Sequence, residues 1–345
     1  MSTRTLGSTG VHVSPLCLGA MMFGRWGEPD HDACVSIIHK ALDSGINFID
    51  TADMYSFGES ETIVGKALVG KRDDVILATK FHNPMHRTDL NKRGNSRRWI
   101  IKEVEDSLTR LQTDWIDLYQ VHRPEPGTDF EETLRALDDL VHQGKIRYIG
   151  TSTYPATEIV EGQWLADRKN LNRVVAEQPP YSIFVRGIER DVLPTAQKYG
   201  MGTLTWSPLA GGWLSGRYTL DKVEPSTSAS RLRSGSPGFD ASLPENQAKL
   251  VAADALGKLA AEAGLTLPQL AIAFVLEHPG VTSAIIGPRT MEQLVTQLGA
   301  DEIQLSQDVL DRIDEIVAPG AILDGMDSGW PLPAMEPKAR RRSLA

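Results

Sequence analysis

The sequence predicts an α/β fold: a (β/α)8 barrel of the TIM type, with a β-hairpin before it and a long loop after its seventh strand. Eight short apolar or β-branched runs recur along the 345 residues, and helical patterns with apolar residues at three- and four-residue spacing lie between them. In addition, no Gly-x-Gly-x-x-Gly turn follows an early strand, as an open sheet of the Rossmann type would require.

The order of these elements decides how the strands pair. Strands that alternate with helices are expected to be parallel, joined by right-handed crossovers. A closed barrel and an open doubly wound sheet both satisfy this rule, and the count of eight strands favours the barrel. The predicted strands are PLCLG (15–19), NFID (47–50), VILATK (75–80), WIDLYQVH (115–122), IRYIGTS (146–152), NRVVAEQ (172–178), MGTLTWS (201–207) and VTSAIIG (281–287).

The remaining segments fit one barrel. The helical segment DFEETLRALDDLVHQG opens with Asp129 as its expected N-cap and closes at Gly144. TRTLGSTGVHVSPL resembles a hairpin that covers the barrel floor. Residues 210–244 are rich in Gly, Ser, Pro and Arg, and so long a loop in a compact domain is usually functional. We therefore expect a single domain over residues 1–345, with the barrel core at about 15–300 and a C-terminal tail at 319–345.

Composition limits the class of protein. The chain is 41% hydrophobic and 23% charged, and its formal charge of −9 argues against nucleic-acid or membrane partners. It contains no long apolar run, no signal-peptide pattern and only two cysteines, Cys17 and Cys34, so a reduced, cytoplasmic enzyme is expected. The basic run KARRR (338–342) is expected to be a solvated tail. The oligomeric state cannot be predicted.

Polar residues stand where the predicted strands end. In barrels of this class the active site lies at the carboxyl ends of the strands, so these side chains should converge. Four ionisable residues come from three adjacent strand ends and the loop after the first of them: Asp50, Tyr55, Lys80 and His122. Other polar or aromatic residues at strand ends are Ser152, Gln178, Trp206 and Ser207.

The chemistry of the four ionisable residues is complementary. Tyrosine is a poor acid at neutral pH because its pKa is about 10. We expect the Lys80 ammonium to lower the pKa of Tyr55, and Asp50 to keep that ammonium charged and oriented. His122 should stay neutral beside a cation and donate a hydrogen bond to a substrate oxygen. Tyr55 is therefore the predicted general acid.

Six motifs together resemble the aldo-keto reductase superfamily, from the hairpin to about residue 318. The branch that they resemble includes bacterial general reductases and potassium-channel β-subunits. The motifs are GINFIDTADMY (45–55), ILATK (76–80), DLYQVHRP (117–124), QPPYSIFVR (178–186), TWSPLAGGWLSGRY (205–218) and IIGPRTMEQL (285–294).

The resemblance implies an NADP-dependent oxidoreductase that acts on small carbonyl compounds. The family's catalytic tetrad falls on Asp50, Tyr55, Lys80 and His122. In this family NADPH lies across the barrel mouth, its nicotinamide C4 delivers hydride to the carbonyl carbon, and the tyrosine protonates the oxygen. The long loop after the seventh strand would cover the cofactor.

The resemblance also implies cofactor contacts. Ser152 and Gln178 would bind the carboxamide, although this chain has Ser152-Thr153 where many relatives have Ser-Asn. Trp206 would stack on the nicotinamide, and Arg289 would bind the 2′-phosphate, which favours NADPH over NADH. The other expected contacts are Gly19, Met21, Ser207, Leu209, Gly211, Ser215, Arg217, Arg231, Gly287, Gln293 and Gln297. For Arg231, a solvated surface arginine is the alternative.

Residues of the substrate pocket are harder to predict. The candidates are Phe23, Trp26, Phe81 and Arg123, with packing of a rim loop as the alternative. No metal is expected, because Pro84 breaks the helix that His82 and His86 would need for ligand spacing. Two other functions remain open: an NADPH-binding regulatory subunit with vestigial activity, and a metal-dependent barrel hydrolase, which lacks a suitable carboxylate–histidine cluster.

Overall fold

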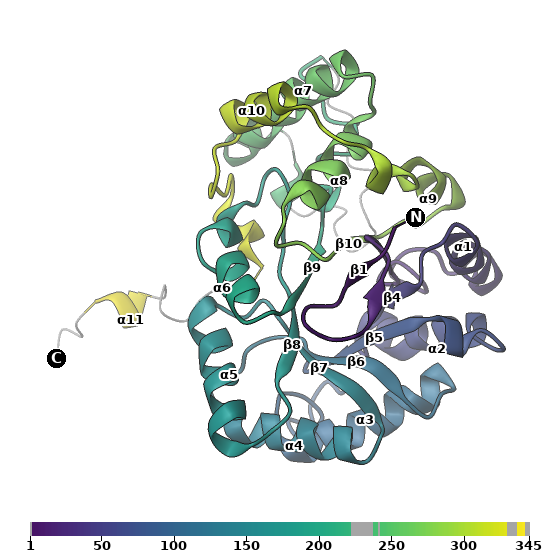
Figure 1. Cartoon of the computed structure of the whole chain (residues 1–345). Coiled ribbons are helices and arrows are strands. Elements are labelled where there is room, and N and C mark those ends of the chain that lie inside the picture. The colour runs from purple at the N-terminus through teal and green to yellow at the C-terminus, as the bar shows by residue number, and fades with distance from the viewer. Residues whose placement is uncertain (1, 222–236, 241, 330–336, 342–345) are drawn as a thin grey trace.

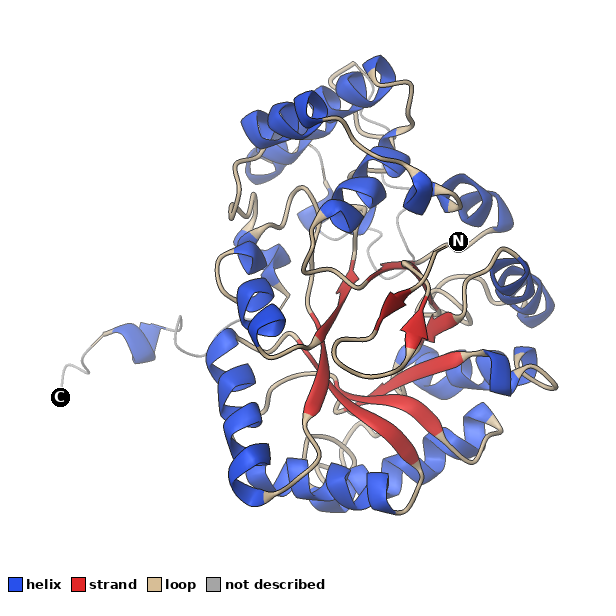
Figure 2. Ribbon diagram, viewed as in Figure 1, coloured by secondary structure: helices blue, strands red, loops and turns tan. Residues whose placement is uncertain are grey.

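The computed structural model of the protein describes residues 2–221, 237–240, 242–329 and 337–341. These residues form a closed barrel of eight parallel strands, in the order β10-β3-β4-β5-β6-β7-β8-β9, which confirms the predicted fold class. In Figure 2 the strands lie at the centre and the helices surround them. The barrel strands are β3 (Leu16–Gly19), β4 (Phe48–Asp50), β5 (Ile76–Phe81), β6 (Ile116–Val121), β7 (Ile146–Ser152), β8 (Val174–Gln178), β9 (Gly202–Trp206) and β10 (Ser283–Ile286).

Helices alternate with the strands and form the outer layer (Figure 1). Asp129 accepts a hydrogen bond from the Glu131 backbone at the start of α4, as its sequence predicts. Within the described ranges no single helix has the length and apolarity to cross a membrane, although α7 and α8 meet that test as a pair bent by 91°. The helices are α1 (His31–Asp43), α2 (Glu59–Ala67), α3 (Arg97–Leu111), α4 (Phe130–His142), α5 (Ala156–Lys169), α6 (Val192–Lys198), α7 (Gln247–Glu262), α8 (Leu267–Glu277), α9 (Met291–Gln297), α10 (Gln307–Ile316) and α11 (Pro337–Arg340).

The predicted N-terminal hairpin is present. Strands β1 (Arg4–Thr5) and β2 (His12–Val13) pair antiparallel, and in Figure 1 they lie across the centre of the barrel. The hairpin covers the amino-terminal end of the strands, since Gly7 packs against the backbone of residues 200–202 at the start of β9. Its apolar side chains join the cluster inside the barrel, which contains Leu6, Val13, Cys17, Phe48, Ala78, Leu118, Ala176, Leu204 and Ile285.

The alternation of side chains along each strand separates this inner cluster from the outer core. On β5, Ala78 belongs to the inner cluster, whereas Leu77 and Phe81 pack in the core between barrel and helices. Because side chains alternate with period two, Lys80 faces the same way as Ala78, into the barrel. The carboxyl end of the barrel thus receives polar side chains and the floor receives apolar ones.

Two segments outside the barrel core differ in how far they can be described. Of the predicted loop at 210–244, residues 222–236 and 241 are outside the described residues. By contrast, the first part of the predicted C-terminal tail packs on the body of the protein. Leu323 and Ala321 form backbone hydrogen bonds with Phe184 and Arg186, and Lys249 of α7 forms ion pairs with Asp324 (2.8 Å) and Asp327 (2.6 Å).

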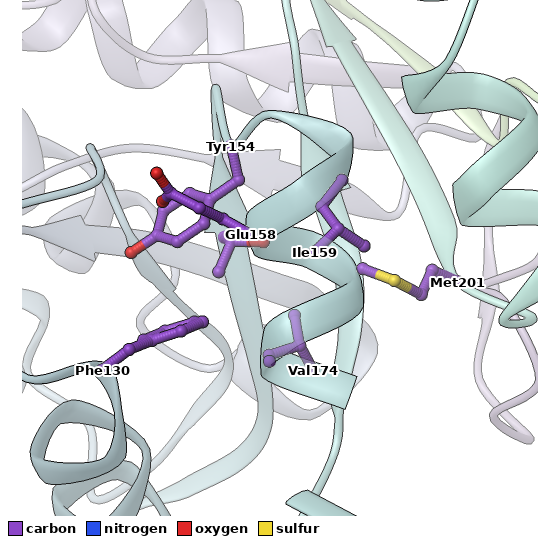
Figure 3. Close-up of a pocket in the computed structure, with 8 residues that line it drawn as sticks. Phe130, Tyr154, Glu158, Ile159, Val174 and Met201 are labelled. Atoms are coloured by element: carbon purple, nitrogen blue, oxygen red, sulfur yellow. The ribbon is translucent and has the colours of Figure 1, made fainter. Parts of the chain in front are cut away.

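The packing of α5 against the barrel wall is shown in Figure 3. The rings of Phe130 and Tyr154 lie 5.4 Å apart between centroids, and the missing side chain of Gly162 gives Phe130 its space. The void between these residues has no room for a water molecule and lies on the outside of the barrel, so it is a packing gap. It is lined by Phe130, Thr151, Tyr154, Glu158, Ile159, Gly162, Val174 and Met201.

Gly65 of α2 should be intolerant of a side chain, because an added Cβ would lie 2.7 Å from the Arg110 backbone oxygen of α3. We expect Gly65→Ala to lower the free energy of unfolding by about 1–3 kcal/mol. The matched control is Gly257→Ala in α7, where no atom lies within 4 Å of the added carbon. That change should raise stability by about 0.5–1 kcal/mol. Urea unfolding measures both, and a Gly65→Ala variant as stable as the parent would contradict the packing described.

Glu177 should make stability fall as the pH rises. It is fully buried on β8, where it accepts hydrogen bonds from Thr151 Oγ1 (2.5 Å) and the Tyr154 backbone (3.1 Å). Burial raises the pKa of Glu177 to about 7. The unfolded chain therefore loses this proton at lower pH than the folded one, and the stabilisation disappears as the pH rises toward 7.

The variant Glu177→Gln cannot lose that proton. When the pH rises from about 5 to about 8, the free energy of unfolding should fall in both proteins, but by about 2–3 kcal/mol less in the variant than in the parent. Chemical denaturation at the two pH values measures the difference. Glu161→Gln, at an exposed position of α5, is the control and should follow the parent. An identical pH response in Glu177→Gln and the parent would contradict the raised pKa.

Candidate active site

Three neighbouring strands bring three of the predicted tetrad residues to one end of the barrel. Asp50 ends β4, Lys80 is the penultimate residue of β5, and His122 directly follows β6. All three side chains are buried. Tyr55 begins a 3-10 helix (Tyr55–Gly58) in which Ser56 and Phe57 have φ values of 50° and 57°. This tight turn after β4 returns the tyrosine to the barrel end.

Lys80 joins the carboxylate and the phenol. Its Nζ donates to Asp50 Oδ2 at 2.5 Å, to the Thr51 carbonyl at 2.8 Å and to Tyr55 Oη at 3.2 Å. An ammonium has three hydrogens, so each of them has an acceptor. The structure thus brings Asp50, Lys80 and Tyr55 together as a hydrogen-bonded chain.

The second carboxylate oxygen of Asp50 is fixed from across the barrel. Gln120 of β6 and Gln178 of β8 donate to Asp50 Oδ1 at 3.1 Å and 2.8 Å, and Gln178 also donates to Gln120 Oε1 at 3.2 Å. Both glutamines are buried. Asp50 therefore accepts from three side chains, which fix the position of its carboxylate.

The electrostatics around Tyr55 differ in part from the prediction. Burial raises the pKa of Tyr55, and although Lys80 acts to lower it, the net direction is upward. Lys80 therefore acts in the expected direction, but the prediction did not include burial, which outweighs it. For Lys80, burial alone would lower the pKa, but Asp50 and Tyr55 raise it above the ordinary value. At neutral pH the site holds a charged lysine and a protonated tyrosine.

His122 lies beside the phenol. Its ring is edge-on to the Tyr55 ring, with centroids 5.8 Å apart. Burial holds the pKa of His122 well below its ordinary value, and the cations Arg123 and Lys80 lower it further. The imidazole is therefore neutral, as expected, although burial contributes more than the neighbouring charges. Asn83 Nδ2 lies 3.0 Å from His122 Nδ1.

The residues expected to bind the cofactor follow the remaining strands around the barrel. Ser152 ends β7, Gln178 ends β8 and Trp206 ends β9, so they occupy successive strand ends next to the tetrad. Ser152 is fully buried, and its hydroxyl donates to the backbone carbonyl of Gln178 at 2.8 Å. Trp206 is partly exposed. Gln178 presents its amide nitrogen to Asp50, so it also belongs to the tetrad's hydrogen-bond network.

The loop after β9 is sharply coiled. Ser207, Ala210 and Gly211 all have positive φ, at 59°, 48° and 68°. Leu209 accepts backbone hydrogen bonds from Gly212 and Leu214, and Ser215 Oγ donates to the Gly212 carbonyl. Non-glycine residues with positive φ are costly, and such strain concentrates at functional sites. Arg217 lies at the end of this coil, and Arg231 is outside the described residues.

The end of β10 carries the other predicted cofactor residues. Gly287 follows the strand and is exposed, and no atom lies within 4 Å of the place a Cβ would take. Arg289 is partly exposed, and its backbone N–H donates to Gln293 Oε1 at 2.8 Å. Gln297 is only 6% exposed, and its contact with a nucleotide stays a prediction. Gly19 and Met21 lie at and just after the end of β3, the strand between β10 and β4.

The predicted pocket residues divide into two pairs. Trp26 lies against Tyr55, with ring centroids 6.1 Å apart, and Arg123 reaches toward Ser152 Oγ and Thr153 Oγ1 at 3.4 Å each. Phe23 and Phe81 are fully buried in the outer core, which corrects their assignment to the pocket. Phe81 points away from the mouth because it follows the inward-facing Lys80 on the same strand.

Sequence reasoning missed three features of this end of the barrel. Gln120 could have been found, since it stands two residues before His122 and so shares its side of β6. Asn83 lies in a loop without periodicity and gave no signal. Gly329 of the C-terminal segment lies against Trp206, Thr153 and Pro180, which only the folded chain reveals. In the part of the chain that is described, no three His, Cys, Asp or Glu residues are placed to hold a metal ion.

Comparison with known proteins agrees with this geometry. Residues 15–318 match the model of the aldo/keto reductase family. The chain is 38% identical over 328 residues to the uncharacterized oxidoreductase YrpG of Bacillus subtilis, covering 92% of this chain and 96% of the relative. It is 39% identical over 299 residues to the aldo-keto reductase YhdN of the same organism, covering 85% and 87%.

A relative of another kind is equally similar. A Schizosaccharomyces pombe protein, provisionally named voltage-gated potassium channel subunit beta, is 36% identical over 321 residues, covering 91% of this chain and 92% of the relative. The family match, these identities and the barrel architecture are consistent with one another. The chain therefore belongs to the aldo/keto reductase family, a family of NAD(P)-dependent oxidoreductases.

Proposed function

We propose that the protein catalyses the NADPH-dependent reduction of aldehydes or ketones to alcohols, with Tyr55 as the general acid. One observation carries the proposal: Lys80 Nζ contacts Asp50 Oδ2 and Tyr55 Oη at the same time, at the carboxyl end of the barrel. An ion pair with a purely structural role would require only Lys80 and Asp50, without the Tyr55 hydroxyl. The contact with Tyr55 instead connects a buried charge to a group that can give up a proton.

The residues at the neighbouring strand ends fit a nicotinamide dinucleotide. The side-chain nitrogen of Gln178 donates to Asp50 and Gln120 inside the barrel. Its side-chain oxygen, Oε1, is then left to accept a hydrogen bond from the carboxamide of the nicotinamide. Trp206 offers a partly exposed aromatic surface, and Arg289 offers a cation for the 2′-phosphate. The open space around Gly287 allows close approach of the ligand to the backbone. When bound, NADPH supplies the hydride for the carbonyl carbon.

The protein's own groups manage the proton and the charge. Tyr55 gives its proton to the substrate oxygen as the alcohol forms. Lys80 stabilises the phenolate that remains, and Asp50 keeps Lys80 charged and in place. His122 is neutral and donates a hydrogen bond that orients the substrate oxygen. Because Tyr55 has a raised pKa, its proton is present over the whole neutral range before the reaction.

A second candidate function is a regulatory subunit that binds NADPH and has only vestigial activity. The similarity to a protein provisionally named as a potassium channel subunit supports it. The presence of all four tetrad residue types in hydrogen-bonding or ring contact favours an active enzyme. The absence of turnover across aromatic aldehydes, dicarbonyls, sugars and ketosteroids would favour the regulatory function. The cytoplasmic location stays a prediction.

Removal of the Tyr55 hydroxyl should abolish reduction without loss of the cofactor site. We expect Tyr55→Phe to lower kcat for an activated aldehyde by roughly 10²–10⁴-fold, because general acid catalysis is lost. NADPH binding, followed by fluorescence quenching, should stay unchanged. Tyr199→Phe, on a partly buried tyrosine just before β9 at the opposite end of the barrel, is the matched control. Turnover by Tyr55→Phe at the parent's rate would refute the assignment.

Arg289 should decide the preference for NADPH over NADH. We expect Arg289→Ala to raise the Kd for NADPH roughly 10–100-fold, since a charge-assisted hydrogen bond to the 2′-phosphate is lost. Binding of NADH, which lacks this phosphate, should change little. The control Arg147→Ala removes an exposed arginine at the amino-terminal end of β7. Equal weakening of both cofactors in titration experiments would contradict the role of Arg289.

A further inference from the structure

The proposed role of His122 requires a hydrogen on one particular ring nitrogen. A neutral imidazole carries a single N–H, at either Nδ1 or Nε2, and the other nitrogen can only accept. The hydrogen bond made by one nitrogen decides which of the two is protonated. The partner of Nδ1 is therefore decisive for what His122 can offer to a substrate.

The Asn83 amide supplies that partner. Asn83 Nδ2 lies 3.0 Å from His122 Nδ1, at a distance typical of a hydrogen bond. In this orientation of the amide the nitrogen donates, so Nδ1 accepts and the ring hydrogen is on Nε2. No described residue forms a hydrogen bond with Nε2.

Backbone strain and several hydrogen bonds hold the backbone next to Asn83. His82 has a φ of 138°, a conformation that side chains other than glycine rarely adopt. Its carbonyl accepts from the Gly94 backbone at 2.6 Å, and its Nδ1 lies 2.8 Å from Asn95 Oδ1. Pro84, on the other side, restricts Asn83 itself to extended conformations.

The same network reaches the segment that follows His122. Asn95 is buried, and its side-chain nitrogen donates to the Arg123 carbonyl at 3.0 Å. Its backbone N–H donates to Glu125 Oε2 at 2.6 Å. Asn95 thus fastens the loop after β5 to the loop after β6 close to the Asn83–His122 contact. The strained backbone and these bonds hold the loop from which the Asn83 side chain extends to His122.

We propose that Asn83 is a positioning residue that keeps the proton of His122 on Nε2, so that the imidazole presents an N–H to the substrate oxygen. The effect of Asn83 on catalysis rests on the proposed function, whereas its effect on the His122 tautomer rests only on the contact between the two side chains. Asn83 acts through His122 and needs no contact with substrate. Without its amide, the ring can turn and can carry its hydrogen on either nitrogen.

The chemistry of Asn83→Asp separates this role from simple packing. Aspartate has nearly the same shape as asparagine, but a carboxylate only accepts hydrogen bonds. It would draw the hydrogen of His122 to Nδ1 and leave Nε2 as an acceptor, or favour the imidazolium despite the nearby Arg123, Lys80 and His82. A structural role would be preserved better by Asp than by Ala. A tautomer-fixing role predicts that Asp is the more harmful change.

Nitrogen-15 NMR of the histidine rings tests the tautomer without any substrate. The signals of His122 are assigned by their loss in His122→Gln. In the parent protein at neutral pH, Nδ1 should be unprotonated and Nε2 protonated. In Asn83→Asp, Nδ1 should be protonated. A parent spectrum with the hydrogen on Nδ1, or an Asn83→Asp spectrum that matches the parent, would overturn the proposal.

Kinetics of aldehyde reduction then measure the consequence. We expect kcat to fall roughly 10-fold in Asn83→Ala and further in Asn83→Asp, with the KM for NADPH unchanged. Asn91→Ala, an exposed asparagine of the same loop, should behave as the parent. Equal losses in the Ala and Asp variants would overturn the proposal. If the parent itself reduces no carbonyl compound, the proposed function fails, and the ring-nitrogen spectra still decide the role of Asn83.

Discussion

A fully buried ammonium organises the functional end of this barrel. Lys80 has no contact with water, and an unpaired charge in such a place would be strongly destabilising. Its three hydrogens are accepted by Asp50, Thr51 and Tyr55. Asp50 in turn accepts from Gln120 and Gln178, so side chains from β4, β5, β6 and β8 meet in one network. The charge is satisfied only when these four strands close into a barrel, which links the fold to the chemistry.

Burial makes the charge of Lys80 energetically unfavourable unless it is paired. The same burial also determines the protonation of Tyr55 and His122. It raises the pKa of Tyr55 and lowers that of His122, so both side chains are neutral and both carry a hydrogen at physiological pH. The site therefore contains one compensated ion pair and two neutral donors. Such an arrangement suits a reaction in which negative charge develops on a carbonyl oxygen, because the donors are oriented in advance.

Much of this arrangement could be predicted from the sequence. The alternation of apolar strands and helices predicted the barrel, and the rule that sites lie at the carboxyl ends of strands selected Asp50, Lys80 and His122. The same alternation, applied strictly, would have excluded Phe81, which follows Lys80 and faces the other way, and would have added Gln120. The directions of the Phe81 and Gln120 side chains were predictable, because the alternation of side chains along a strand depends only on the local sequence.

Other features depend on the folded chain. Asn83 lies in a loop that is held by bonds within itself, such as that of His82 with Asn95, and by the bond of Asn95 to Arg123 in the next loop, and no periodicity marks it. The net pKa of Tyr55 depends on how far burial outweighs Lys80, which residue types alone do not determine. Gly329 lies against Trp206 at the end of a segment that Lys249 anchors through ion pairs with Asp324 and Asp327.

A crystal structure of the protein with bound NADP⁺ tests the central claim most directly. It should show Lys80 Nζ within hydrogen-bonding distance of both Asp50 Oδ2 and Tyr55 Oη, with the phenol directed toward the nicotinamide. A phenol oxygen that faces bulk solvent, far from the lysine, would contradict the account.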